Sequence, residues 1–288
     1  MAETCPLSLS DWLATDALPR LRQAAPRYQQ AEPFPHLVLD GFFDEARLRG
    51  LGESYYDGLD ARWHRFNDAS REVKLQIDQD EHFPPPVRAL LHALNSAPFL
   101  RELSELTGIP GLVPDPYHLG GGMHQILPGG KLAIHADYNL HPVMRLNRRL
   151  NLLVYLNEDW QEDFGGHLEL WDREMQACCH RIAPLFNRLV VFQTDSSSYH
   201  GHPDPLRCPE HRSRRSLALY YYTQEGADDL RASGGHSTLF KARPGERFGA
   251  SPYLRRVGTA GRLVTEAAKL LVPEGVKQLL RRAPRGGA

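Results

Sequence analysis

A histidine and an aspartate two positions apart, His135 and Asp137, stand in the stretch KLAIHADYNL, which is typical of a strand. Residues i and i+2 of a strand face the same side, so an imidazole and a carboxylate would enter one space. A further strand-borne histidine, His200, follows in SSSYHGHPDP. Two histidines and one carboxylate form a facial triad that leaves three metal positions open. Such a triad suits a non-haem ferrous ion that binds a substrate and oxygen together.

A histidine two positions before an acidic residue is by itself weak evidence for a metal site. The pattern occurs again at His202 and Asp204, where the intervening proline and the prolines that follow are typical of a turn. A related pair, His167 and Glu169, lies on another expected strand. A purely structural role is the alternative for each of these histidines. The metal hypothesis for the first pair therefore depends on what accompanies it.

An arginine begins the alternating segment RRSLALYYYT. Arg215 shares one strand face with Leu217, Leu219 and Tyr221. A buried arginine is costly unless an anion pairs with it. A dicarboxylate cosubstrate could supply that anion, because a guanidinium binds a carboxylate through two parallel hydrogen bonds. The segment thus predicts an anion-binding arginine close to the metal.

The elements that must position these residues change character near residue 116. Before it, helical spacing and caps predict helices over 8–30, 43–56 and 84–108, with strands at 34–43 and 72–78. After it the hydrophobic period is two, and turn signals such as PGG, FGG and DRE separate short segments. The expected strands are 117–127, 131–138, 149–157, 166–171, 177–182, 187–194, 197–202 and 214–223. Many short strands with close turns predict a sandwich or a barrel.

We therefore expect three regions. Residues 1–116 are a helical and strand support of the same domain, residues 117–224 are the β core, and residues 225–288 are a C-terminal extension. The start of the extension looks irregular, while residues 259–283 place apolar residues at helical spacing among basic ones. A basic amphipathic helix packed on the barrel is expected there, with a partner or a membrane surface as the alternative.

Composition limits the classes of function. The 288 residues are 41% hydrophobic and 24% charged, with a formal net charge of -1, so no overall field attracts nucleic acid. Four cysteines without a CxxC pair indicate reduced thiols and a cytoplasmic location. The opening MAETCPLSLSDWL does not have the pattern of a secretory signal, and no apolar run is long enough to cross a bilayer. The oligomeric state is left open.

Six segments resemble, in order, the catalytic core of the Fe(II)/2-oxoglutarate oxygenases, and within them the prolyl-4-hydroxylase branch. They are LPGGKLAIHAD, LNLLVYLNEDW, GGHLELW, IAPLFNRLVVFQTD, YHGHPDP and RRSLALYYYT. YLNEDW followed by a GG strand and P-x-x-N-R-L-V-x-F is far more specific than the HxD pair. The resemblance covers residues 117–223. It implies a mainly β fold with flanking helices, namely a double-stranded β-helix, the jelly-roll barrel of the cupin-like kind.

The resemblance also assigns roles to single residues. His135, Asp137 and His200 match the iron ligands of the family. Arg215 matches the arginine that binds the distal carboxylate of 2-oxoglutarate. Tyr155 matches a tyrosine that hydrogen-bonds the same carboxylate.

Other residues are assigned with alternatives. Asn151 shares the strand face of the tyrosine in LLVYLN and is expected to line the pocket. Leu127 departs from the family pattern, since the hypoxia-sensing enzymes have a cosubstrate-binding tyrosine there, and Gln125 is expected to serve instead. The candidates for contact with the substrate are Asn139, Tyr221 and Arg149.

Two neighbouring arginines compete with the one assigned above. GHPDPLRCPEHRSR makes a longer loop before the last strand than in the hypoxia-sensing enzymes, so Arg212 and Arg214 are alternatives to Arg215. Arg215 is preferred because its face continues through the leucines of the strand. A solvated loop is expected for Arg145, Arg148 and Arg149, with a rim that attracts an anionic substrate as the alternative.

The function implied is that of a Fe(II)- and 2-oxoglutarate-dependent dioxygenase. It would hydroxylate an unactivated C–H bond of a peptidyl residue of the prolyl type, an amino acid or a small biosynthetic intermediate, with succinate and CO2 as coproducts. The expected cofactors are Fe(II), 2-oxoglutarate and O2, with ascorbate as a candidate reductant. The alternatives are a zinc-dependent hydrolase that uses the same three ligands and a non-catalytic cupin-like binding barrel.

Overall fold

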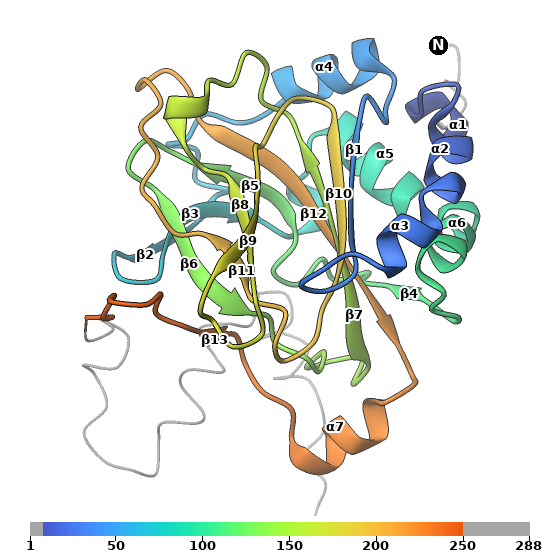
Figure 1. The fold of residues 1–288 in the computed structure, drawn as a ribbon. Helices are drawn as coiled ribbons and strands as arrows, with labels where there is room; N and C mark the ends of the chain where they lie inside the picture. Colours follow the sequence, from blue (N-terminus) through green and yellow to red (C-terminus); the bar gives the residue numbers. More distant parts are fainter. Residues whose placement is uncertain (1–7, 250–288) are drawn as a thin grey trace, which may run out of the picture.

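The computed structural model of the chain describes residues 8–249, and residues 1–7 and 250–288 lie outside the described range. The helix expected over 259–283 is therefore outside it. Within the described range, most of the N-terminal helices gather on one side of a strongly curved sheet, while the helix near the C-terminal end, in orange, lies apart from them (Figure 1). No helix of this range is both long and apolar enough to cross a membrane.

The α-helices of the first half lie within the predicted ranges, and residues 8–30 are divided into three short helices. Asp44 caps α4 by accepting a hydrogen bond from the backbone N–H of Arg47 at 2.9 Å. Gly108 ends α6 with a φ of 71°, a conformation that glycine adopts without strain. The bounds are α1 Leu9–Trp12, α2 Ala17–Gln23, α3 Ala25–Gln29, α4 Glu45–Glu53, η1 Asp80–His82, α5 Pro85–Leu94, α6 Ala97–Thr107, η2 Glu162–Phe164 and α7 Ala227–Ser233.

The strands form one hydrogen-bonded path in the order β1-β10-β7-β12-β5-β3-β6-β11-β8-β9, with β2 on β3, β4 on β12 and β13 on β6. The bounds are β1 His36–Asp40, β2 His64–Asp68, β3 Glu72–Ile77, β4 Val113–Pro114, β5 Gly122–Ile126, β6 Lys131–Ala136, β7 Asn147–Tyr155, β8 Leu168–Trp171, β9 Cys178–Ile182, β10 Arg188–Gln193, β11 His200–His202, β12 Arg214–Thr223 and β13 Leu239–Phe240. Side chains of β7 and β10 meet those of β8 in one buried cluster, so the two halves of the path face each other. The fold is a double-stranded β-helix.

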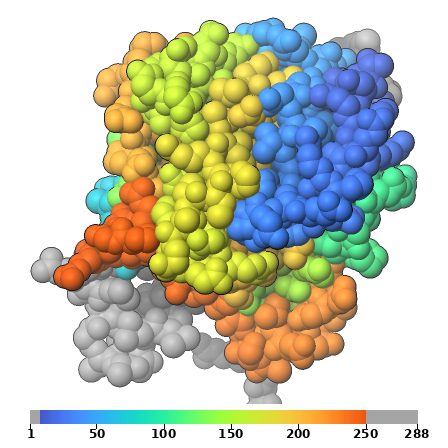
Figure 2. Space-filling view, in the orientation of Figure 1, coloured from blue at the N-terminus to red at the C-terminus, as the bar shows by residue number. Residues whose placement is uncertain are grey.

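The two faces of the sheet that contains β7 and β12 pack against different parts of the protein. Leu152 and Val154 of β7 and Leu217 and Leu219 of β12 belong to the main hydrophobic core, together with the side chains of the N-terminal helices. Tyr155, from the other face of β7, belongs to the core between the two halves. The helices therefore cover the outer face, and the alternate residues point into the barrel. Figure 2 shows the N-terminal segment, in blue, packed against the yellow strand region.

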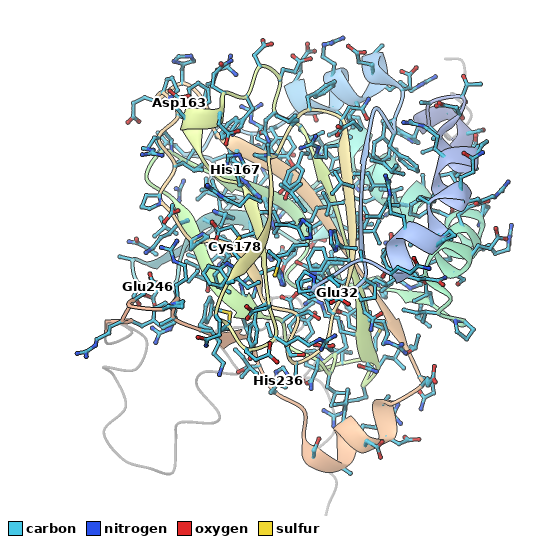
Figure 3. The ribbon with its side chains drawn as sticks, in the orientation of Figure 1. Glu32, Asp163, His167, Cys178, His236 and Glu246 are labelled. Carbon is cyan, nitrogen blue, oxygen red and sulfur yellow. The ribbon has the colours of Figure 1, made fainter. Side chains whose placement is uncertain are left out.

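Segments before and after the predicted core complete the barrel. β3 pairs with both β5 and β6 and so joins the two halves. β13 pairs with β6, with Phe240 opposite His135. The first part of the C-terminal extension, expected to be irregular, thus contains a helix and a strand. Its backbone is fixed at His236, labelled in Figure 3, whose N–H donates to Oδ1 of Asn139 at 2.8 Å.

Candidate active site

Three side chains from two paired strands converge inside the barrel. His135 lies on β6, Asp137 follows the end of that strand, and the register of β11 places His200 directly opposite His135. Nε2 of His135 lies 3.5 Å from Oδ1 of Asp137, and Nε2 of His200 lies 3.4 Å from its Oδ2. One ligand atom from each residue lies within 4.8 Å of the other two. The sequence prediction that these residues meet is confirmed.

Hydrogen bonds orient both imidazoles toward the carboxylate. Nδ1–H of His135 donates to the carbonyl of Ala133 at 2.9 Å, and Nδ1–H of His200 donates to that of Ser198 at 2.9 Å. Each Nε2 is therefore left with its lone pair toward the space beside Asp137. Burial lowers the pKa of His200 to about 4, against the opposing effect of the nearby carboxylate, so this imidazole is neutral. Neutral imidazoles fixed through their second nitrogen are typical metal ligands.

The donor set fits a divalent transition metal. It offers two imidazole nitrogens and one carboxylate oxygen from one side, as in the facial triad of non-haem Fe(II) oxygenases. Phe192 packs edge-on against His200 with ring centres 4.7 Å apart, and Phe240 lies 5.5 Å from the ring centre of His135. The ligands are thus held in an apolar surround. We conclude that this group could hold iron without rearrangement of either histidine.

Two residues of β7 hold the carboxylate of the group. Nδ2–H of Asn151 donates to Oδ2 of Asp137 at 2.8 Å, and Nη2 of Arg148 lies 3.0 Å from the same oxygen. Arg148 is only 2% exposed and also donates to Oδ1 of Asn151. Burial opposes its charge, but the Asp137 carboxylate and the nearby tyrosine hydroxyls together outweigh this effect and raise the pKa of Arg148. Asn151 thus supports the metal group rather than contacting a cosubstrate.

The prediction of a solvated loop around Arg148 is wrong, and the structure gives the reason. The register between β7 and β12 shifts at Tyr221 and Tyr222, so that Arg148 rather than Arg149 faces Tyr222. This bulge turns Arg148 into the barrel, where its guanidinium lies 3.5 Å from the ring centre of Tyr220. Arg149 instead donates to Oγ1 of Thr223. Its predicted role at the substrate side is not supported by this position.

The anion-binding arginine is also placed differently. Arg214 is 4% exposed, and its Nη2–H donates to the hydroxyl oxygen of Tyr155 at 3.1 Å, while its Nε–H donates to the carbonyl of Gly166 at 2.7 Å. Among residues 8–249, no carboxylate pairs with this guanidinium. Burial raises the pKa of Tyr155, so its hydroxyl stays protonated and could donate a hydrogen bond to a bound carboxylate. Arg214 and Tyr155 together could hold an anion.

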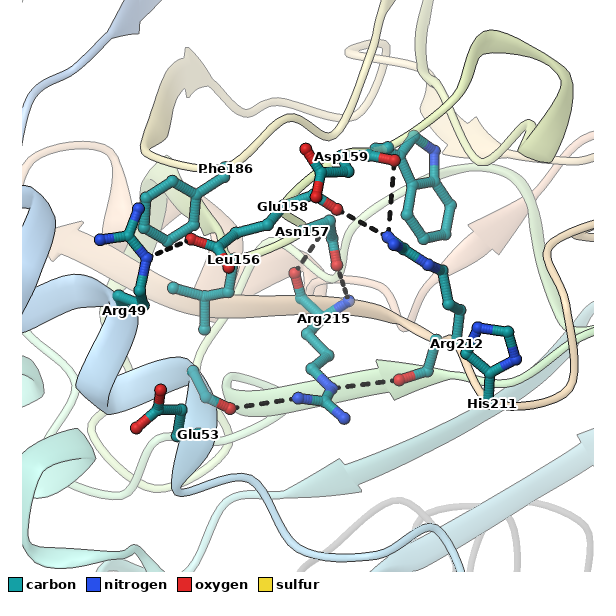
Figure 4. A pocket seen from close by; sticks show the side chains of 13 residues that line it. Arg49, Glu53, Leu156, Asn157, Glu158, Asp159, Phe186, His211, Arg212 and Arg215 are labelled. Carbon is teal, nitrogen blue, oxygen red and sulfur yellow. Dashed lines mark hydrogen bonds and ion pairs between the residues drawn. The ribbon is translucent and has the colours of Figure 1, made fainter.

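Arg215, the residue preferred from the sequence, lies on the outer face. Its Nη1–H donates to the carbonyl of Gly52 in α4 at 3.1 Å, and its Nε–H donates to Oγ of Ser213. It lines an open pocket of about 360 Å³ on that face, together with Arg212 (Figure 4). The preference was wrong because the leucine face of β12 packs against the helices. The alternative, Arg214, is the one that enters the barrel.

The side chains of Gln125 and Tyr221, which were predicted to contact the cosubstrate and the substrate, lie on the same outer face. Gln125 donates to Oγ of Ser213 at 3.0 Å, and Tyr221 donates to the carbonyl of Leu94 in α5 at 3.1 Å. Both side chains are therefore structural, and the cosubstrate and substrate contacts predicted for them are wrong. Asn139, the third substrate-side candidate, is buried, and its side-chain oxygen accepts a hydrogen bond from the N–H of His236.

A second group of potential ligands lies outside the barrel core. Asp80, His92 and His118 also bring one ligand atom each within 4.8 Å of the others. Two of them are more exposed, and the Asp80 carboxylate already contacts Arg88 at 3.0 Å and His92 at 2.7 Å. A bound cation would have to share this carboxylate with a guanidinium. The buried group in the barrel is therefore the stronger candidate.

The fold and the ligand group define a double-stranded β-helix with a two-histidine, one-carboxylate centre. Residues 121–222 match the model of the 2OG-Fe(II) oxygenase superfamily. This match over part of the chain confirms the resemblance to the 2OG-Fe(II) oxygenases that was inferred from the sequence. Over 79 residues, or 26% of this chain, the sequence is 32% identical to the Mus musculus prolyl 3-hydroxylase OGFOD1. That match spans 14% of the relative's length.

Solved structures show the same fold. A Pseudomonas putida prolyl-4-hydroxylase aligns with a TM-score of 0.51 and 17% identity, covering 71% of this chain and 100% of the other. A Trichoplax adhaerens prolyl hydroxylase, in complex with a peptide fragment of the hypoxia inducible factor oxygen degradation domain, aligns with a TM-score of 0.51 and 18% identity. It covers 77% of this chain and 98% of the other. Identities this low establish the shared double-stranded β-helix alone.

Proposed function

We propose that this protein is a Fe(II)- and 2-oxoglutarate-dependent dioxygenase that hydroxylates an unactivated C–H bond and releases succinate and CO2. One observation supports this proposal above the others. The buried group of His135, Asp137 and His200 shares the barrel interior with Arg214, a buried cation without a carboxylate partner in the described range. A metal centre beside an unpaired guanidinium suits a cosubstrate that both chelates iron and carries a second carboxylate.

Each residue has a distinct task in this proposal. His135, Asp137 and His200 would hold the ferrous ion, which together with 2-oxoglutarate supplies the oxygen-activating chemistry. Arg214 and the Tyr155 hydroxyl would bind the distal carboxylate of 2-oxoglutarate. The structure gives further positioning roles to the residues of β7, since Arg148 and Asn151 fix the Asp137 carboxylate. Metal binding, carboxylate binding and the positioning of Asp137 would thus depend on side chains that the fold already orients.

The apolar side chains between the two halves of the barrel exclude water from this space. Phe192, Leu170 and Val190 are fully buried there. Exclusion of water strengthens the attraction between Arg214 and a carboxylate, because the local dielectric constant is lower than in bulk solvent. It also limits side reactions of a reactive centre.

The substrate we propose is a peptidyl residue of the prolyl type, an amino acid or a small biosynthetic intermediate. The three relatives described above are prolyl hydroxylases, which supports the first of these. A zinc-dependent hydrolase would leave the pairing of Arg214 with Tyr155 without a purpose, and a non-catalytic barrel would bind 2-oxoglutarate without releasing succinate. A cytoplasmic location stays a prediction.

Anaerobic absorption spectroscopy tests the proposal. Addition of Fe(II) and then 2-oxoglutarate to the metal-free protein should produce the visible charge-transfer band of a chelated 2-oxo acid. The variants His135→Ala and Asp137→Ala should not show the band, whereas His92→Ala, from the second group of ligands, should keep it. A folded wild-type protein without the band, or a band lost only in His92→Ala, would refute the assignment.

A further inference from the structure

A second histidine of β11, His202, also points into the barrel, on the side where Arg214 lies. His202 follows His200 by two residues on the same strand and is 4% exposed. His202 is the last residue of β11, in agreement with the strand expected over 197–202, and the chain bends at Asp204. His202 pairs with Leu132 of β6, which in turn pairs with Glu72 of β3. His202 thus belongs to a continuous wall formed by β3, β6 and β11.

The imidazole of His202 has an unused polar atom. Its Nδ1 is buried and has no hydrogen-bond partner. Gln76 of β3, 4% exposed, also has a buried side-chain oxygen without a hydrogen-bond partner. A buried polar atom without a partner costs about 1–3 kcal/mol, so native proteins rarely leave one unless a ligand or water completes it. An acceptor atom of a ligand would complete Nδ1–H of His202, whereas the Gln76 oxygen is itself an acceptor and requires a donor such as water.

The register of the strands connects this wall with the arginine. Gln76 lies opposite His124 of β5, and His124 lies opposite Ser216 of β12. Arg214 is two residues from Ser216 on the same strand, and its Nε–H donates to the carbonyl of Gly166, two residues before β8, whose Glu169 pairs with Gly201 next to His202. Lys74, two residues before Gln76 on the same wall, is already paired with Glu72 at 3.4 Å. Arg214 is therefore the unbalanced cation beside His202, and an anion is the ligand that suits both.

We propose that Nδ1–H of His202 donates a hydrogen bond to the 2-oxoglutarate carboxylate that Arg214 binds. His202 would then connect the metal ligand His200 with the far end of the cosubstrate along a single strand. This inference rests on the proposed function, since it assumes that 2-oxoglutarate enters the barrel. It adds a third donor to the Arg214 and Tyr155 pair. A hydrogen bond to a charged group corresponds to roughly a tenfold or greater change in affinity.

Calorimetric titration of 2-oxoglutarate into the Mn(II)-loaded, full-length protein without oxygen tests the inference. His202→Leu removes the donor and should weaken 2-oxoglutarate binding about tenfold or more. His202→Asn retains an amide N–H close to the position of Nδ1 and should bind within about threefold of the wild type. His202→Gln, whose N–H reaches the position of Nε2 instead, should resemble the leucine variant. Because asparagine and glutamine are both polar, this pair remains informative if the leucine variant does not fold.

His167→Leu is the matched control. His167 is also a buried histidine with an unpartnered Nδ1, but it lies outside the wall and its Nε2 contacts Glu162 at 3.1 Å. Its loss should leave the 2-oxoglutarate affinity unchanged. No binding to the wild type would contradict the proposed function itself. Binding to the wild type and equally to His202→Leu would overturn only the role of His202, as would an asparagine variant as weak as the leucine one.

Discussion

Nη2 of Arg148 lies 3.0 Å from Oδ2 of Asp137, and both side chains are buried in the barrel. Removing one partner of such a pair leaves an uncompensated buried charge, which costs about 3–5 kcal/mol. Arg148→Met should therefore lower the stability of the metal-free protein by about this amount in urea unfolding. Mn(II) should raise the melting temperature of the variant more than that of the wild type, because the ion replaces the missing positive charge. A metal-free variant as stable as the wild type would show that the pair is not important.

Asn151 orients the same carboxylate without carrying a charge. Its Nδ2–H donates to Oδ2 of Asp137 at 2.8 Å. Loss of a hydrogen bond that orients a metal ligand typically weakens metal binding by about 10–100-fold. Asn151→Leu should show this loss in Mn(II) titrations followed by electron paramagnetic resonance. Asn157→Leu, which removes another buried asparagine that bonds only backbone groups, should bind Mn(II) as the wild type does.

Arg214 and Arg215 are adjacent but point to opposite faces of β12. Arg214→Met should reduce the affinity for 2-oxoglutarate by roughly 100-fold or more, since two charge-assisted hydrogen bonds of about 1.5–3 kcal/mol each are lost. Arg215→Met should change it little, because that side chain bonds Gly52 and Ser213 on the outer face. Calorimetric titration of both variants with Mn(II) present makes the comparison. The reverse order of effects would restore the assignment made from the sequence.

Phe192 is fully buried and packs edge-on against the metal ligand His200. Phe192→Ala should destabilise the protein by about 3–5 kcal/mol through the lost contacts and the cavity left behind. For a protein of this size each kcal/mol lowers the melting temperature by about 2–4 °C. It should also weaken Mn(II) binding, since the His200 ring loses its support. Phe99→Ala, in α6, should show the loss of stability without the loss of metal affinity.

Burial raises the pKa of Asp78 to about 6 from its usual 3.8, although it accepts a hydrogen bond from Gln76 at 3.2 Å. The folded state therefore holds a proton that the unfolded state releases between about pH 4 and pH 6. The contribution of Asp78 to the free energy of unfolding is lost as the pH rises through this window. Asp78→Asn should be more stable than the wild type at pH 7 and should lose this pH dependence. Urea unfolding at pH 4, 5, 6 and 7 compares the two, and parallel curves would contradict the assignment.

The metal group could be predicted from the sequence because it depends on local spacing and on a third histidine in a recognisable segment. His135 and Asp137 are two residues apart near a strand end, and no distant contact alters that relationship. The helix caps at Asp44 and Gly108 were predictable for the same reason. Features of this kind are decided by neighbours along the chain.

The arginines could not be assigned in this way. Both faces of β12 carry apolar residues, and only the packing of the N-terminal helices decides that the leucine face is the outer one. Strict alternation also fails at two of the register shifts, the one between β7 and β12 and the one between β6 and β11. The first brings Arg148 into the barrel in place of Arg149. The second lies at His200 and His202, where prolines after the strand indicated a turn.

A crystal structure of the full-length protein with Mn(II) and 2-oxoglutarate, grown without oxygen, tests the central claim most directly. We predict one metal ion on Nε2 of His135, Nε2 of His200 and the carboxylate of Asp137. The distal carboxylate of 2-oxoglutarate should contact Arg214 and the Tyr155 hydroxyl. Metal bound only at Asp80, His92 and His118, or 2-oxoglutarate held at Arg215 on the outer face, would contradict the account.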